Sequence, residues 1–274
     1  MTAYPRGGTQ PEDLRMQWFT SLDGWVQALL ASLMMYLMTA LGASFVFFSK
    51  KINKTFLTAL TGLAAGIMVA ASFFSLLLPA IEQESALPSY ITVTLGFALG
   101  GAFIVLSDLA LSRSSLSFHS IGDKKNALLF LAVTLHNIPE GMSVGVAFAV
   151  APAMGEGGAA LSAFLLAVGI AVQNFPEGMC VAFPLRAKGM SPLRSFLFSQ
   201  GSGAVEIPAC VVGALAATAI GGILPWALSF SAGAMIAVVC SELIPECFSG
   251  NKTVASAGLI AGFCLMMILD LALG

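Results

Sequence analysis

The sequence predicts an all-α membrane protein of eight transmembrane helices with inverted-repeat organisation, and two observations lead to this prediction. First, 58% of the 274 residues are hydrophobic and only 9% are charged, whereas soluble domains carry about 25% charged residues. Second, clusters of Lys, Arg, Gly and Pro divide the chain into apolar stretches, each near the ~20 residues that span a bilayer. These stretches cover residues 25–48, 56–79, 90–111, 127–150, 159–184, 195–219, 223–246 and 254–273.

The connections between these stretches alternate along the chain between those with basic residues and those without them. Ten of the twelve Lys and Arg residues follow the first, third, fifth and seventh stretches. Because Lys and Arg favour cytoplasmic connections, both termini are expected to be extracytoplasmic. The expected location is the plasma (inner) membrane, although the charge bias itself gives only the orientation. The basic residues are Lys50, Lys51, Lys54, Arg113, Lys124, Lys125, Arg186, Lys188, Arg194 and Lys252, and the opposite connections hold Glu82, Glu84 and Glu156.

The short connections leave no room for a separate soluble domain, so residues 25–274 are expected to form one transmembrane domain. Residues 1–24 are polar and lack an apolar core of their own, and we expect them to be an extracytoplasmic tail rather than a cleavable signal peptide.

Several function classes are disfavoured by what the sequence lacks. It contains no GxxxxGK[ST] loop for nucleotide and no HExxH motif of a metalloprotease, so we expect no enzyme. It has no basic stripe with interleaved aromatic residues, so we expect no nucleic-acid partner. Its five cysteines have the spacing of neither a disulfide framework nor a CxxC zinc site. They are Cys180, Cys210, Cys240, Cys247 and Cys264.

Two copies of one motif are the strongest functional signal. Residues 136–141 read His-Asn-Ile-Pro-Glu-Gly, and residues 173–178 read Gln-Asn-Phe-Pro-Glu-Gly. They are separated by one stretch plus one connection, so the two copies are predicted to run in opposite directions through the membrane, as in transporters built from inverted repeats. Pro139 and Pro176 each remove a backbone hydrogen bond and are expected to kink their helices.

The acidic residues of these stretches have no basic partner. Glu140, Glu177 and Glu206 lie deep in apolar stretches, and every Lys and Arg lies in a connection or in the tail. Buried carboxylates cannot all remain ionised unless a cation compensates them, so the counter-ion must come from outside. The His136–Glu140 and Gln173–Glu177 pairs are each spaced i, i+4 on one helix face. Imidazole with carboxylate suits zinc, iron, nickel or copper better than magnesium or calcium.

Further polar side chains extend this candidate site. Asn137 and Asn174 lie about 100° around their helices from the paired residues and could serve a second, adjacent site. Met68, Ser72 and Ser75 form a stripe spaced i, i+4, i+7 on the second stretch. A thioether from Met68 would favour zinc or cadmium over hard cations, although taken alone Met68 is typical of core packing.

The paired motif and the eight-stretch layout resemble the ZIP (Zrt-, Irt-like) metal transporter family. The Gln-Asn-Phe-Pro-Glu-Gly copy, the segment at 64–72 and the Glu-Leu-Ile-Pro-Glu segment at 242–246 indicate its GufA-like branch. The resemblance covers essentially the whole chain after residue 24. It implies a homodimer that moves divalent transition metal into the cytoplasm by an elevator-like movement. Zinc is the first candidate substrate, with cadmium, iron and manganese as others, and no permanently bound cofactor is expected.

The resemblance also implies a binuclear metal centre halfway across the membrane. Its first site would be lined by Met68, His136, Glu140, Gln173 and Glu177. Asn137, Asn174 and Glu206 would complete the second site, with Glu140 and Glu177 bridging, and Asp108 and Glu242 would mark the route to the cytoplasm.

Two departures from the family and two other functions remain open. Related members can carry Asp at Asn174 and His at Gln173, so a weaker or less zinc-selective second site is expected here. The alternative functions are a selective metal channel and a membrane metal sensor without transport.

Overall fold

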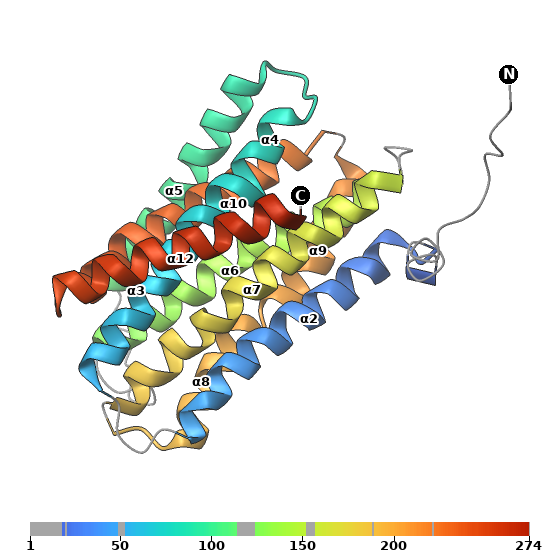
Figure 1. Ribbon diagram of the computed structural model, residues 1–274. Coiled ribbons are helices and arrows are strands. Elements are labelled where there is room, and N and C mark those ends of the chain that lie inside the picture. The colour runs from blue at the N-terminus through green and yellow to red at the C-terminus, as the bar shows by residue number, and fades with distance from the viewer. Residues whose placement is uncertain are drawn as a thin grey trace, which may run out of the picture.

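The computed structural model describes residues 18–19, 21–48, 53–113, 124–151, 157–187, 189–220 and 222–273, and all regular structure in these ranges is helical (Figure 1). This confirms the all-α prediction. In chain order the α-helices are α2 (Gly24–Ser44), α3 (Lys54–Ala71), α4 (Leu78–Glu82), α5 (Ser89–Arg113), α6 (Lys124–Val150), α7 (Gly157–Ala187), α8 (Pro192–Gly203), α9 (Glu206–Ala219), α10 (Leu224–Val238), α11 (Ile244–Phe248) and α12 (Lys252–Leu273). A 3-10 turn, η1 (Phe45–Phe47), and two π-helical segments, η2 (Ser72–Leu77) and η4 (Val239–Leu243), join some of them.

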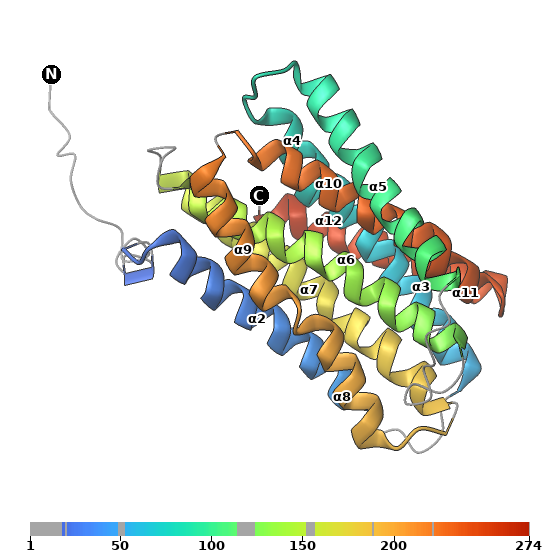
Figure 2. The same ribbon diagram turned by 180° about the vertical axis from the view of Figure 1, so that it is seen from behind.

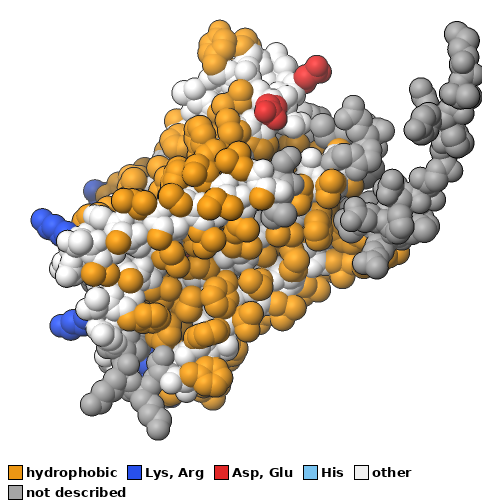
Figure 3. All heavy atoms as spheres, in the orientation of Figure 1, with side chains coloured by type: hydrophobic (Ala, Val, Ile, Leu, Met, Phe, Trp, Pro, Cys, Tyr) orange, Lys and Arg blue, Asp and Glu red, His pale blue; other side chains and the backbone are white. Residues whose placement is uncertain are grey.

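Seven helical segments of the described chain are long and apolar enough to cross a membrane, which makes this a multi-pass membrane protein. They coincide with seven of the eight predicted stretches. The remaining stretch, 127–150, corresponds to α6, a 27-residue helix that is not among the seven and carries His136, Asn137 and Glu140 near its middle. On the face shown in Figure 3, hydrophobic side chains cover the middle of the molecule, with Lys and Arg at one end and Asp and Glu at the other.

The helices form two bundles, which lie side by side in Figures 1 and 2. The site bundle consists of α2, α6, α7, α8 and α9, and the flanking bundle of α3, α4, α5, α10, α11 and α12. In the site bundle α2 packs on α7 and α6 on α9, and in the flanking bundle α3 packs on α12 and α5 on α10. The two bundles meet where α6 contacts α10 and where α3 contacts α7. The two helices that carry the paired motif, α6 and α7, therefore both contact the flanking bundle.

Glycine marks the closest helix contacts within each bundle. A Cβ on Gly66 of α3 would overlap the backbone of α12, and one on Gly42 of α2 would overlap the backbone of α7. Every described glycine whose added Cβ would clash with another helix's backbone faces a helix of its own bundle. Gly169 of α7 faces the other bundle, and there a Cβ would meet only side-chain atoms, Met266 Cε at 3.2 Å and Ser75 Oγ at 3.4 Å. Small residues allow helix backbones to approach closely in lipid, so each bundle is tightly packed internally.

Prolines shape three places in the fold. The helix of the sixth stretch breaks at residues 204–205, between α8 and α9, just before Pro208. Pro79 and Pro245 each follow a π-helical segment. Because proline lacks an N–H and its ring clashes with the carbonyl one turn earlier, a wider turn before it accommodates both effects. By contrast, α6 and α7 continue as helices through Pro139 and Pro176.

Candidate metal centre

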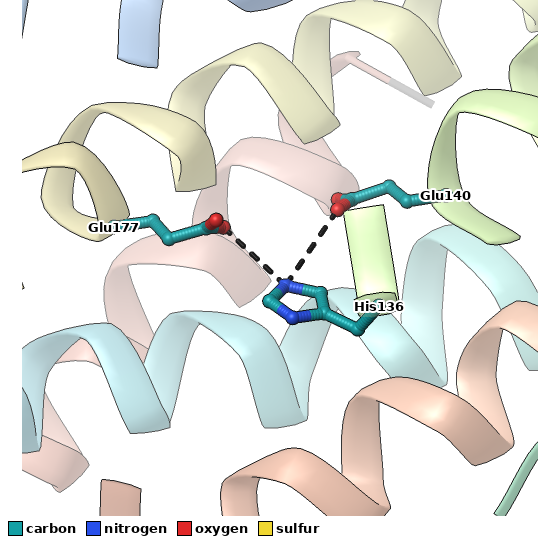
Figure 4. A group of neighbouring side chains, drawn as sticks. All are labelled: His136, Glu140 and Glu177. Carbon is teal, nitrogen blue, oxygen red and sulfur yellow. Dashed lines mark ion pairs between the residues drawn. The ribbon is translucent and has the colours of Figure 1, made fainter. Parts of the chain in front are cut away.

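Three side chains with metal-binding atoms meet between α6 and α7 (Figure 4). The His136 Nε2 atom lies 3.9 Å from Glu140 Oε2 and 3.5 Å from Glu177 Oε2. The three ligand atoms all lie within 4.8 Å of one another, and the three residues are at most 3% exposed. Zinc binds nitrogen and oxygen ligands at about 2.0–2.2 Å, so atoms at these separations can share one ion after small side-chain adjustments.

The carboxylates of this cluster have more acceptor oxygens than nearby donors. Gln173 Nε2 donates a hydrogen bond to Glu140 Oε1. Within the described part of the chain, Glu140 Oε2 and both carboxylate oxygens of Glu177 accept no hydrogen bond, and no lysine or arginine forms an ion pair with either residue. Buried acceptors without donors are costly. The arrangement therefore suits a cation.

Met68 of α3 reaches the same place from the flanking bundle. It is 1% exposed, and it lines a cavity of about 10 Å³ together with His136 and Glu177, enough space for about one water molecule. Ser72, on the same stripe, donates to the Met68 carbonyl at 2.7 Å. Ser75 donates at 2.6 Å to Asp270 Oδ1 on α12 instead. The residues of the predicted stripe therefore do not all face one place: Met68 faces the cluster, whereas Ser75 faces α12.

The residues predicted for a second site already have hydrogen-bond partners, and two of them, Asn174 and Glu206, bond to one another. Asn174 Nδ2 donates to both oxygens of Glu206, at 2.8 and 2.9 Å. Asn137 Nδ2 donates to the Ser202 carbonyl at 3.0 Å. All three predicted residues are fully buried. In this arrangement the Asn174 amide, rather than a cation, lies against the Glu206 carboxylate.

The serines of α8 are a feature that sequence reasoning missed. Ser199 donates to the Gly178 carbonyl at 2.6 Å, and the Ser202 carbonyl accepts from Asn137. Ser195, Ser199 and Ser202 are all fully buried. Their i, i+4, i+7 spacing in an otherwise apolar stretch is the signal that would have found this polar face.

The two residues predicted to mark the exit route lie outside the cluster. Asp108 on α5 and Glu242 in η4 are both half-buried, in the flanking bundle. Their role in the route stays a prediction.

Buried carboxylates and an imidazole on apolar helices define a class, the integral membrane proteins that handle metal ions. The chain belongs to the ZIP zinc transporter family, whose model matches residues 112–270. It is 34% identical over 338 residues to the human zinc transporter ZIP11, covering 90% of this chain and 97% of the relative.

Two bacterial relatives give the same result. The chain is 39% identical over 258 residues to the zinc transporter GufA of Myxococcus xanthus, covering 90% of this chain and 98% of that one. It is 36% identical over 248 residues to the zinc transporter ZIPB of Bordetella bronchiseptica, covering 86% and 78%. The resemblance to the ZIP family and to GufA is confirmed, and the family is one of transporters, not of enzymes.

Proposed function

We propose that this chain carries divalent transition metal ions, zinc first, into the cytoplasm through an intramembrane binuclear site on α6 and α7. The observation that carries the proposal is the buried cluster of His136, Glu140 and Glu177, whose carboxylate oxygens exceed the available donors. Nitrogen and oxygen ligands with a nearby thioether favour zinc or cadmium, and the relatives named above are zinc transporters. Iron and manganese are further candidate substrates.

In this proposal α6 also crosses the membrane and, with the seven segments named above, brings the number of transmembrane helices to eight. Its 27 residues give a length of about 40 Å at 1.5 Å per residue, more than the ~30 Å hydrocarbon core. With eight spans both termini lie outside the cytoplasm. The bias of basic residues along the sequence and their gathering at one end in Figure 3 support this orientation. A homodimer in the plasma (inner) membrane belongs to the same proposal.

Transport proceeds by alternating access. An ion enters from the extracytoplasmic side and displaces protons or water from Glu140, Glu177 and Glu206. The site bundle then shifts against the flanking bundle and opens a path to the cytoplasm, along which Asp108 and Glu242 lie. The glycine contacts support such a movement. Every described glycine whose added Cβ would clash with another helix's backbone faces a helix of its own bundle, and a Cβ on Gly169 would meet only side chains of the other bundle.

The second ion of the binuclear site requires a rearrangement. Glu140 and Glu177 bridge the two ions, and Glu206 is the further carboxylate. Asn174 must turn its Nδ2 away from Glu206 and present its Oδ1, which accepts no hydrogen bond within the described chain. Occupancy of the second site is therefore expected to follow that of the first.

Uptake of radioactive zinc into proteoliposomes containing the purified protein tests the function. Saturable, strongly temperature-dependent uptake that is lost in the Glu140→Ala/Glu177→Ala double variant is the expected result. Uptake that never saturates would favour a channel. Stoichiometric zinc binding without uptake would favour a sensor and overturn the transport proposal.

A further inference from the structure

One cysteine shares the cavity of the first metal site. The cavity is lined by Met68, His136 and Glu177, and also by Cys180, which is 5% exposed and lies three residues after Glu177 on α7. The rest of its lining is apolar, from Ala64, Val133, Val181, Val238 and Leu243. Cys180 is therefore the remaining side chain of this lining that can bind a metal.

Two further lining residues of the cavity lie to one side of the first site. Cys180 follows Glu177 on α7, which ends near Arg186, and Ala64 precedes Met68 on α3, which begins at Lys54. Both helices therefore place their additional lining residue toward the end that carries basic residues. In the proposed orientation this end is the cytoplasmic one, so an ion leaving the first site passes Cys180.

Cys180 lies at the boundary between the bundles, in the same cavity as an unsatisfied carboxylate. Its thiol donates to the Leu60 carbonyl over a long distance of 3.8 Å and also hydrogen-bonds the Thr61 side chain. Both oxygens of Glu177, a residue 3% exposed that lines the same cavity, accept no hydrogen bond within the described chain.

The other cysteines are placed differently. Cys210 donates to the Ala28 carbonyl at 3.2 Å, and Cys247 to the Ile244 carbonyl at 3.3 Å. Cys240 and Cys264 are exposed. None of these four lines the cavity.

We propose that Cys180 is an additional metal ligand on the cytoplasmic side of the first site, and that it makes the chain select soft ions, cadmium and zinc, over manganese. Thiolate and thioether ligands bind soft metals in preference to hard ones, and Met68 and Cys180 provide one of each on the same cavity. The inference rests on the proposed function for the direction in which the ion passes Cys180, but the binding of metal by Cys180 does not depend on it.

Cadmium binding to the purified full-length protein in detergent tests this assignment. A cadmium–thiolate bond gives an ultraviolet charge-transfer absorption band, which a merely structural cysteine does not. We expect the band in the unmodified protein and in the control variant Cys264→Ser, and its loss in Cys180→Ser and Cys180→Ala. Two variants are used so that a folding defect in one does not decide the result.

Affinity measurements complete the test. Loss of the thiol is expected to lower cadmium affinity by about tenfold, the lower end of what loss of a supporting group costs at metal sites, and to lower manganese affinity less. Retention of the band in both Cys180 variants, or equal loss of affinity for the two metals, would overturn the assignment. Failure of zinc uptake by the unmodified protein in proteoliposomes would instead overturn the transport proposal and leave the cadmium result standing.

Discussion

The two halves of the candidate metal centre differ in how their carboxylates are satisfied. In the first half, Glu140 accepts one hydrogen bond from Gln173, and Glu177 accepts none within the described chain. In the second half, Glu206 accepts two hydrogen bonds, both from the Asn174 amide. Burial is the same in both halves, so the difference lies in the number of donors. The first half therefore suits a cation, whereas in the second half an amide lies against the carboxylate.

This difference indicates an order of binding. An ion entering the first half meets acceptor oxygens that have no partner to give up. An ion entering the second half must replace the two hydrogen bonds that Asn174 donates to Glu206, and hydrogen bonds to charged groups contribute about 1.5–3 kcal/mol each. The first half is therefore expected to bind metal more tightly.

The largest expected effect is that of removing the unsatisfied carboxylate. Glu177→Ala is expected to lower zinc uptake by about 100-fold or more, because it removes a ligand where loss of a mere supporting group already costs about 10–100-fold. Uptake into proteoliposomes measures this, and circular dichroism checks that the helices remain. Glu84→Ala, at an exposed residue outside the helices, is the matched control and should transport normally. Near-normal flux in Glu177→Ala would refute the site.

An intermediate effect is expected from making the second half resemble the first. Asn174→Asp replaces the donor amide with a carboxylate, so Glu206 loses its internal partner and a cation must replace it. We expect the affinity of the second zinc ion to rise by about tenfold, or 1.4 kcal/mol, in equilibrium dialysis.

The neighbouring asparagine provides the control for that change. Asn137 bonds to the Ser202 carbonyl, so Asn137→Asp would place a carboxylate against a carbonyl oxygen and is expected to weaken binding. An unchanged second binding step in Asn174→Asp would show that the amide does not limit the second half.

The smallest expected effect is that of pH. Protons and metal ions compete for the same carboxylates and imidazole, so zinc affinity should fall as pH is lowered from about 7.5 to about 5. The fall should be steeper in Asn174→Asp, which offers one more competing carboxylate. Zinc isotherms at several pH values measure both. An affinity independent of pH over this range would be the contrary result.

The sequence alone predicted those features that depend on spacing within one helix. Hydropathy located the helices, and the i, i+4 pairs correctly placed His136 and Glu140 on one face. It did not predict features that depend on how two helices meet. The donation from Asn174 to Glu206, the polar face of α8 and the place of Cys180 in the cavity all depend on the register between neighbouring helices. The π-helical segment before Pro79 was likewise not predicted, because a proline in the sequence indicates a disturbed helix but not the form that the disturbance takes.

The glycine contacts have a consequence for how substitutions would divide between stability and turnover. A larger residue at Gly66 would force apart two helices of one bundle, so its effect belongs to the folded state and should appear as a lower melting temperature. A larger residue at Gly169 would meet only the side chains of Met266 and Ser75 in the other bundle. Under the proposed alternating-access cycle, its effect would fall on the passage between the two access states, and so on the rate of each transport cycle rather than on survival of the fold.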